Sequence, residues 1–169
     1  MRALNELPFL ERYSAQSTAE LLALEGKYRV DSLVLAFEMA LGQKSSREAE
    51  SLSGTEVIIL AVEALEREVN NGGFDQFFVN SAEYSPVVVQ ALQAIGCIGV
   101  ARIAEQAVRS LNLQGTPTTS AVQSAMATDD EARSCALSEC TDRYFASREN
   151  IEVALFSYIK AHRFDVTLG

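Results

Sequence analysis

The feature that most constrains the fold is a run of two asparagines and two glycines at residues 70–73. It joins a strongly helical segment, which begins near Glu56, to a cluster of aromatic residues. The first two turns of the helical segment are apolar nearly all round, which is typical of a central helix with neighbours on several sides. Two glycines then end the helix, because glycine adopts the left-handed conformation without a side-chain clash. The sequence therefore predicts a central helix that stops at a tight joint.

Three phenylalanines follow this joint. Phe74, Phe77 and Phe78 have the i, i+3, i+4 spacing of a short helix that lays its rings on a core. The joint has two interpretations: a helix–turn–helix connection whose Asn side chains bond free backbone groups, or a nest of backbone N–H groups that binds an anion. The structural one is favoured, because no phosphate-loop pattern follows. The residues assigned to the joint, as structure or as pocket lining, are Asn70, Asn71, Gly72, Gly73, Phe74, Asp75, Gln76, Phe77 and Asn80.

The rest of the chain also carries helical signals. Ser17 and Glu20 have the spacing of a capping box, Ser85 precedes a proline that suits a first helical turn, and Ser147 is the expected cap of the last helix. No segment alternates apolar and polar residues beside a hairpin turn. We therefore predict an all-α fold, a single compact helical domain of about eight helices. Besides the central helix and a short docking helix after Pro8, helices are expected over residues 17–25, 31–43, 87–95, 99–111, 120–127, 129–145 and 147–162.

Residues 42–54 are polar and form the expected loop. If a boundary exists, it lies there, with residues 1–54 as an N-terminal helical pair packed on a core of residues 55–169. A chain of 169 residues suits one domain, so residues 1–169 are expected to fold together.

The chain is acidic, because 14 Lys and Arg against 23 Asp and Glu give a formal net charge of −9. Phosphate contacts need clusters of basic residues, so direct nucleic-acid binding is not expected. The negative charge serves solubility or forms a surface that attracts a basic protein. The carboxylates expected on such a surface are Glu56, Glu63 and Glu66, on one arc of the central helix, and the run Asp129, Asp130 and Glu131.

Signals of catalysis are missing from the sequence. No nucleophile elbow, phosphate loop, dinucleotide fingerprint or metalloprotease motif is present, so we expect no enzyme, no cofactor and no metal site. Cys97, Cys135 and Cys140 are an odd number without regular spacing, which argues against a disulfide framework. His162 is expected to be a packed residue at a helix end. Without a signal peptide or a membrane span, the expected compartment is the cytoplasm.

The run from Glu68 to Ser81, Glu-Val-Asn-Asn-Gly-Gly-Phe-Asp-Gln-Phe-Phe-Val-Asn-Ser, carries a family resemblance. With residues 28–33, 91–96 and 142–145, it resembles the bacterial domain family that contains the neisserial DNA-mimic protein. The likeness covers roughly residues 28–160.

That resemblance implies a helical interaction protein whose acidic surface occupies the DNA-binding surface of a basic protein such as a transcription factor. The family's named member is a dimer, so the resemblance allows a homodimer. Two alternatives stay open: a neutraliser of a basic toxin or nuclease, and a small-molecule or catalytic pocket at the joint. Exposed carboxylates would favour protein binding, whereas polar side chains converging in a deep pocket would favour the last. That pocket would be lined by Asn70, Asn71, Asp75, Gln76 and Asn80.

Overall fold

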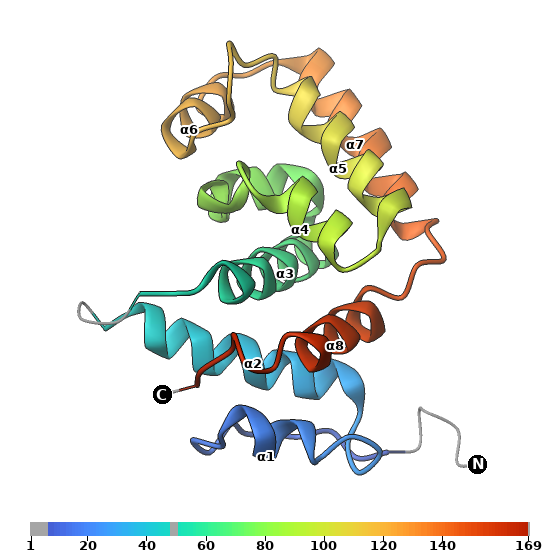
Figure 1. Ribbon diagram of the computed structural model, residues 1–169. Coiled ribbons are helices and arrows are strands. Elements are labelled where there is room, and N and C mark those ends of the chain that lie inside the picture. The colour runs from blue at the N-terminus through green and yellow to red at the C-terminus, as the bar shows by residue number, and fades with distance from the viewer. Residues whose placement is uncertain (1–6, 48–50, 169) are drawn as a thin grey trace. The chain divides into compact units, whose positions relative to one another are not determined.

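The computed structural model describes residues 7–47 and 51–168. Within these residues the regular structure is helical, with eight α-helices, one short 3₁₀ helix and no strand beyond an isolated bridge between Glu25 and Tyr28. The predicted all-α fold is confirmed. The elements (Figure 1) are α1 (Thr18–Leu22), α2 (Val30–Ser45), α3 (Gly54–Asn80), η2 (Ala82–Tyr84), α4 (Val88–Ala94), α5 (Ile98–Ser110), α6 (Thr119–Met126), α7 (Glu131–Phe145) and α8 (Ile151–Ala161).

The chain forms two units. The first unit contains the residues up to Glu63 and those from Asn150 onward, and the second contains Ala64–Glu149. The division falls inside α3, so this helix contributes to both units. The boundary expected at residue 54, and the alternative of one domain, stay predictions.

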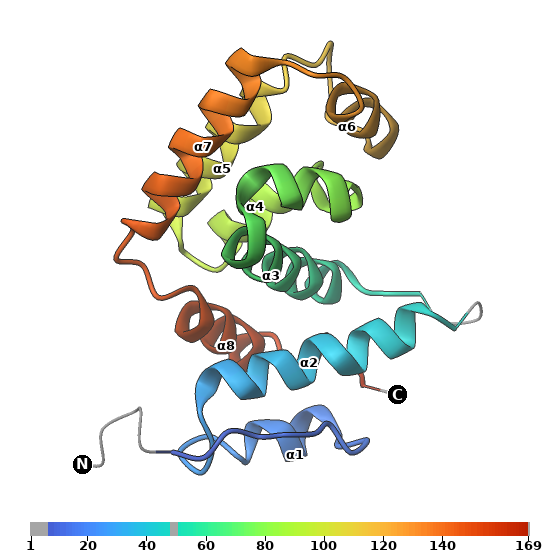
Figure 2. The same ribbon diagram turned by 180° about the vertical axis from the view of Figure 1, so that it is seen from behind.

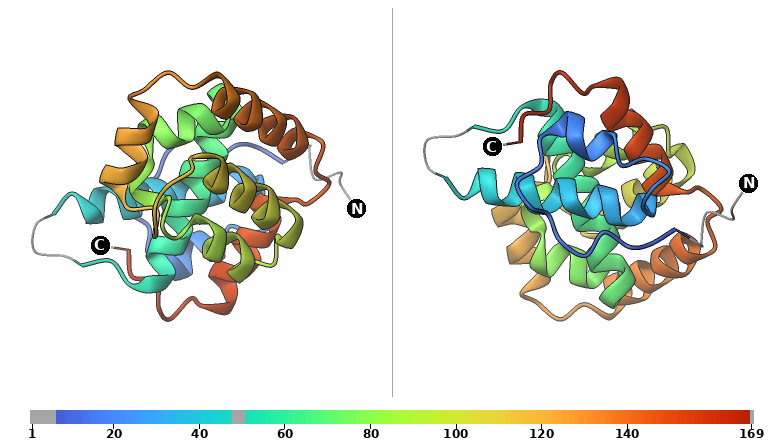
Figure 3. Two further views of the ribbon diagram at one scale, coloured as in Figure 1. Left: turned by 90° about the horizontal axis from the view of Figure 1, so that it is seen from above. Right: turned by 90° about the horizontal axis from the view of Figure 1, so that it is seen from below.

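In the first unit, α2 packs against both α1 and α8, as Figures 1 and 2 show from opposite sides. The apolar face of α2 forms part of the core, because Leu33, Phe37 and Leu41 have no exposed surface. The segment before α1 crosses α2 in the view from below (Figure 3, right). There the backbone N–H of Arg29 donates to the carbonyl of Pro8 at 3.0 Å. This segment is not helical, so the expected docking helix is wrong. The carbonyl of Pro8, which would accept from the amide four residues on in a helix, accepts from Arg29 instead.

In the second unit, α5 packs against α4 and α7, and Figure 2 shows α5 and α7 side by side. Gly96 closes α4 in the left-handed conformation, with a φ of 87°. The amide of Cys97 then donates to the carbonyl of Leu92 at 2.9 Å, which is the bond expected of a Schellman ending. Gly96 therefore ends the helix expected over residues 87–95.

The sequence predicted helix starts at Ser17, Ser85 and Ser147, and the observed N-caps show which of them is right. Ser17 and Glu20 make the predicted capping box of α1. The expected start at Ser85 is wrong, because α4 begins only at Val88, after η2 and a turn. The hydroxyl of Ser85 is buried without a hydrogen-bond partner among the described residues, so it caps nothing.

The last helix also begins later than expected. Asn150, not Ser147, caps α8, and its side-chain oxygen accepts a hydrogen bond from the amide of Val153 at 2.9 Å. Both residue types are good caps, so the sequence alone did not separate them. In α7, the side chain of Asp130 accepts from the amide of Arg133 at 2.9 Å. One residue of the predicted acidic run is therefore the cap of α7.

Candidate functional site

The joint is a kink inside α3. Gly72 has a φ of −161° and a ψ of 20°, and Gly73 has a φ of 76° and a ψ of −173°. The Gly72 φ is extended and open to any residue, whereas the combination at Gly73 is accessible essentially to glycine alone. The predicted need for a glycine is therefore met at Gly73.

Thr141 of α7 fixes the joint from outside. Its Oγ1 accepts a hydrogen bond from the amide of Phe74 at 3.1 Å and donates to the carbonyl of Leu137 at 2.9 Å. A Cβ added to Gly73 would lie 2.8 Å from this oxygen. Close approach and backbone conformation thus both require glycine at residue 73.

Glu68 gathers the polar side chains of the motif. Its carboxylate accepts hydrogen bonds from Gln76 Nε2 and Asn80 Nδ2, each at 2.9 Å, and from Arg67 Nε at 3.0 Å. Burial alone would raise the pKa of Glu68, but these donors outweigh burial and hold the pKa below its ordinary value. A Cβ added to Gly72 would lie 2.1 Å from Gln76 Oε1. Gly72 therefore makes room for the side chain that reaches back to Glu68.

The phenylalanines behind the joint form its core. Phe74, Phe77 and Phe78 have no exposed surface. The ring of Phe74 meets that of Tyr144 edge-on, with centroids 6.0 Å apart, and Phe77 and Phe78 are 5.3 Å apart. The predicted role of these rings in the core is confirmed.

A shallow cavity of about 300 Å³ lies beside the joint. Asn70, Asn71 and Asp75 line it, together with Ser138 and Thr141 of α7. The other two residues expected there, Gln76 and Asn80, are absent from the lining, because their side chains bond Glu68. The polar side chains of the motif thus divide between the cavity and the carboxylate of Glu68, and they do not converge in one deep pocket.

The structure corrects the expected position of Glu56. This residue is only 1% exposed. Its carboxylate accepts two hydrogen bonds from Lys44 Nζ, at 2.8 and 2.9 Å, and one each from the amides of Ser53 and Thr167, both at 2.8 Å. Glu56 therefore holds the end of α2, the start of α3 and the C-terminal segment together, and a partner cannot reach it.

The expected surface position of Glu63 is wrong as well, because this residue is only 7% exposed. Glu66, the third carboxylate on that arc, is partly exposed. A helix with neighbours on several sides has part of its polar arc covered too. The arc expected on α3 is thus not a continuous acidic surface.

An exposed acidic face exists on α7. Asp129, Asp130 and Glu131 are exposed, and so are Glu139 and Asp142 further along the helix. At 100° per residue, Glu131, Glu139 and Asp142 fall within about 80° of one another. They lie opposite the buried face of α7, which carries Arg133, Leu137, Cys140 and Tyr144.

The two arginines of α7 do not pair with its exposed carboxylates, because their guanidinium groups bond elsewhere. Arg133 is 8% exposed and its guanidinium donates to the carbonyl of Thr128. Arg143 donates to Gln106 of α5. Within the described part of the chain, Glu131, Glu139 and Asp142 make no side-chain hydrogen bond or ion pair. We name these three residues, with Asp129 and Asp130, the α7 acidic face.

Three positions were not predicted from the sequence: two on the exposed face of α7 and one that caps α5. Glu139 and Asp142 could have been found by placing α7 on a helical wheel. Glu149 could not, because its role depends on tertiary contact: its carboxylate accepts from the amides of Gly99 and Val100, at 3.0 and 2.7 Å, and so caps α5.

The three cysteines are free thiols, and two of them are buried. Cys97 and Cys140 are buried, Cys135 is exposed, and all three are free. Burial, with the charges of Glu149 and Glu66, raises the pKa of Cys97 to about 11. His162 follows the last turn of α8 and stacks on Tyr158, with ring centroids 4.3 Å apart.

The described residues contain no group of three His, Cys, Asp or Glu side chains suited to holding a metal ion. Among them, no helix has both the length and the apolar character needed to cross a membrane.

The fold and the joint define an all-α domain built on a central helix kinked at glycine. The chain matches the model of the DMP19-like protein family over residues 50–162, and it belongs to that family. The resemblance seen in the sequence is thereby confirmed. No curated protein and no solved structure matches the chain.

Proposed function

We propose that this protein is a DNA mimic, a protein-binding domain that presents the α7 acidic face to the DNA-binding surface of a basic protein. Membership of the DMP19-like family supports an interaction role. The observation that carries the proposal is the exposure of the α7 acidic face, whose carboxylates form no ion pair with other residues in the described part of the chain.

The density of charge on this face is suitable. Residues 129–142 span about 20 Å at 1.5 Å per residue, and they carry five exposed carboxylates. One strand of DNA carries a phosphate every ~3.4 Å along the axis, or about six in the same length. A basic surface shaped for one DNA strand would therefore meet a similar number of charges on α7.

The fold supports such a surface. α7 packs on α5, and Thr141 ties it to the kink of α3. The carboxylates thus project from a helix anchored by buried residues, and little ordering is needed on binding. The glycine joint then positions the binding helix and takes no part in binding.

The test is capture of a partner from lysate of the source cell, at low and at high salt. We expect one basic protein to bind at low salt and to be released by salt, since exposed charge pairs are screened. DNA that carries the partner's own site should compete with this protein for the partner. A partner that binds DNA and this protein simultaneously would contradict mimicry.

The surface is tested with a charge-removing triple variant, Glu131→Gln, Glu139→Gln and Asp142→Asn, which leaves the Asp130 cap in place. The matched control removes three exposed carboxylates elsewhere, by Glu11→Gln, Glu83→Gln and Asp165→Asn. We expect the first variant to weaken binding at least tenfold and the control to change it less than threefold. Equal loss in both would mean that net charge alone, and not this face, drives binding.

A further inference from the structure

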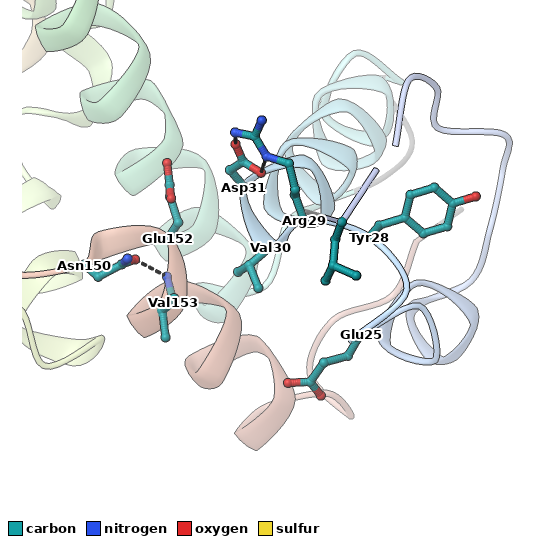
Figure 4. A pocket seen from close by; sticks show the side chains of 10 residues that line it. Glu25, Tyr28, Arg29, Val30, Asp31, Asn150, Glu152 and Val153 are labelled. Carbon is teal, nitrogen blue, oxygen red and sulfur yellow. Dashed lines mark hydrogen bonds and ion pairs between the residues drawn. The ribbon is translucent and has the colours of Figure 1, made fainter. Parts of the chain in front are cut away.

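The first unit contains a cavity of about 380 Å³, between the segment that leads into α2 and the start of α8 (Figure 4). This volume falls in the lower part of the range of small-molecule sites, about 300–1,000 Å³. Leu7, Val30 and Val153 supply apolar surface, and Glu25, Asp31 and Glu152 supply carboxylates.

Two of the three carboxylates already have cationic partners. Asp31 accepts from Arg29 Nε at 3.1 Å and from the second guanidinium nitrogen as well. Glu25 accepts from Lys160 Nζ at 2.6 Å. Counting these two cations against three carboxylates leaves one negative charge, which belongs to Glu152.

Glu152 is unusual among the carboxylates of this unit. It is partly buried, and its side chain makes no hydrogen bond or ion pair with the described residues. Burial raises the pKa of Glu152, the charge of Asp31 raises it further, and Arg29 opposes both effects. A carboxylate in this position gains most from a cation that enters the cavity, because such a cation restores the lost solvation.

The arrangement of the walls sets the shape of the ligand. Figure 4 shows the carboxylates of Glu152 and Asp31 on one side of Val30 and Val153, and that of Glu25 on the other. A ligand in this space would meet charge at its end and hydrocarbon along its length. An anion is disfavoured, because the guanidinium of Arg29 is already engaged by Asp31.

We propose that this cavity binds a small organic cation, an ammonium or guanidinium group on a short alkyl chain, with the cationic group on Glu152 and the chain against Val30 and Val153. This site lies outside the α7 acidic face. Part of its lining, from Leu7 to Asp31, precedes the segment matched by the family model, residues 50–162. The proposal therefore does not rest on the proposed DNA mimicry.

The probes are n-butylguanidinium and n-butylammonium, titrated into the full-length protein labelled with ¹⁵N. We expect saturable shifts at the backbone amides of Asp31, Glu152 and Val153. The controls are butyrate, with the opposite charge, and n-butanol, with none. Butyrate should not bind, and n-butanol should bind at least tenfold more weakly. No saturable binding of either cation, or equal binding of n-butanol, would overturn the proposal.

The role of Glu152 is tested by Glu152→Gln, which keeps the shape and removes the charge. We expect about a tenfold loss of affinity, as for a lost charge-assisted hydrogen bond. Glu83→Gln, at an exposed carboxylate of η2, is the matched control and should leave the affinity unchanged. The melting temperature and amide spectrum of each variant establish that the fold is retained. An unchanged affinity in a folded Glu152→Gln variant would remove Glu152 from the site.

Two further measurements separate this site from nonspecific charge. Affinity should fall as the pH is lowered and Glu152 takes up a proton, and this dependence should shrink in Glu152→Gln. Asp31, Arg29 and Glu25 line the same space, and Lys160 pairs with Glu25. All four remain in both proteins, so the difference reports on Glu152. An identical pH dependence in the two proteins would contradict the proposal.

The source of the cation is distinguished with arginine blocked at both ends as a peptide unit. Binding as tight as that of n-butylguanidinium would assign the site to a basic side chain of a peptide. Binding at least tenfold weaker would assign it to a free small molecule. Both outcomes support a cation site, and loss of binding by every cation excludes it.

Discussion

Lys44 Nζ lies 2.8 and 2.9 Å from the two carboxylate oxygens of Glu56, and the same nitrogen donates to the carbonyl of Thr167 at 3.0 Å. Glu56 is 1% exposed, and the Lys44 side chain is 12% exposed. The pair thus connects α2 and α3 to the C-terminal segment in a buried place. Screening by salt should affect it far less than an exposed pair.

Removal of one partner of this pair should be costly. Breaking a buried ion pair leaves an uncompensated charge, and such changes typically cost about 3–5 kcal/mol. We expect Glu56→Ala to lower the free energy of unfolding by at least ~2 kcal/mol in urea denaturation. Glu131→Ala, an exposed carboxylate, is the control and should change it by less than ~0.5 kcal/mol. A small effect of Glu56→Ala would show that the C-terminal segment contributes little to stability.

The same carboxylate should make stability depend on pH. Burial alone would raise the pKa of Glu56, but Lys44 and the amides of Thr167 and Ser53 outweigh burial and lower it. A lowered folded pKa means that the unfolded chain binds the proton first on acidification. Glu56 therefore contributes its stability above the ordinary glutamate pKa of about 4.3, and this contribution is lost as the pH falls through the folded pKa.

Glu68 should behave in the same direction, because its pKa is lowered as well. We expect the melting temperature to drop steeply below about pH 4.3. In Glu56→Gln, which keeps the shape of the side chain, the drop should be shallower. Parallel melting curves of the two proteins between pH 5 and pH 3 would show that Glu56 does not titrate with a lowered pKa.

The thiols should differ in reactivity. Cys135 is exposed, whereas Cys97 and Cys140 are buried, and burial raises the pKa of both buried thiols. Only the thiolate reacts, so a thiol reagent at neutral pH should modify one cysteine rapidly and the other two only on unfolding. Cys135→Ser should abolish the fast phase. A fast phase that remains in this variant would place a second thiol at the surface.

Local patterns in the sequence predicted the joint, because its determinants are neighbours in the chain. A helix, two glycines and three phenylalanines at helical spacing fix the kink of α3 and the burial of Phe74, Phe77 and Phe78. The same holds for the capping box of Ser17.

The features that the sequence did not predict depend on partners that are distant in the chain. Glu56 is buried because Thr167, 111 residues further on, donates to it. Glu149 caps α5 from 49 and 50 residues away. A helical wheel shows which side chains share an arc, but it does not show what covers that arc. The acidic surface could therefore be expected from composition, while its location on α7 could not.

Gly72 and Gly73 should be required for different physical reasons, and double-mutant cycles can distinguish these reasons. At Gly73 the backbone itself excludes a side chain, with a φ of 76°. At Gly72 the φ of −161° is open to any residue, and the nearest obstacle is the flexible end of Gln76, 2.1 Å from an added Cβ, with the Cβ of Gln76 at 3.0 Å. Gly73→Ala and Gly73→Val should each lower the free energy of unfolding by at least ~1 kcal/mol.

Each reason predicts a different coupling between the glycine substitution and its neighbour. Gly72→Ala should displace the Gln76 amide and break its hydrogen bond to Glu68. Its effect should therefore be smaller in a Gln76→Ala background, where only the contact with the Cβ of residue 76 remains. Gly73→Ala should remain destabilising in a Thr141→Ala background, because the strain lies in the backbone. Urea denaturation of the single and double variants measures both couplings. If Gly73→Ala became neutral once Thr141 was removed, close contact and not the left-handed φ would be what requires glycine there.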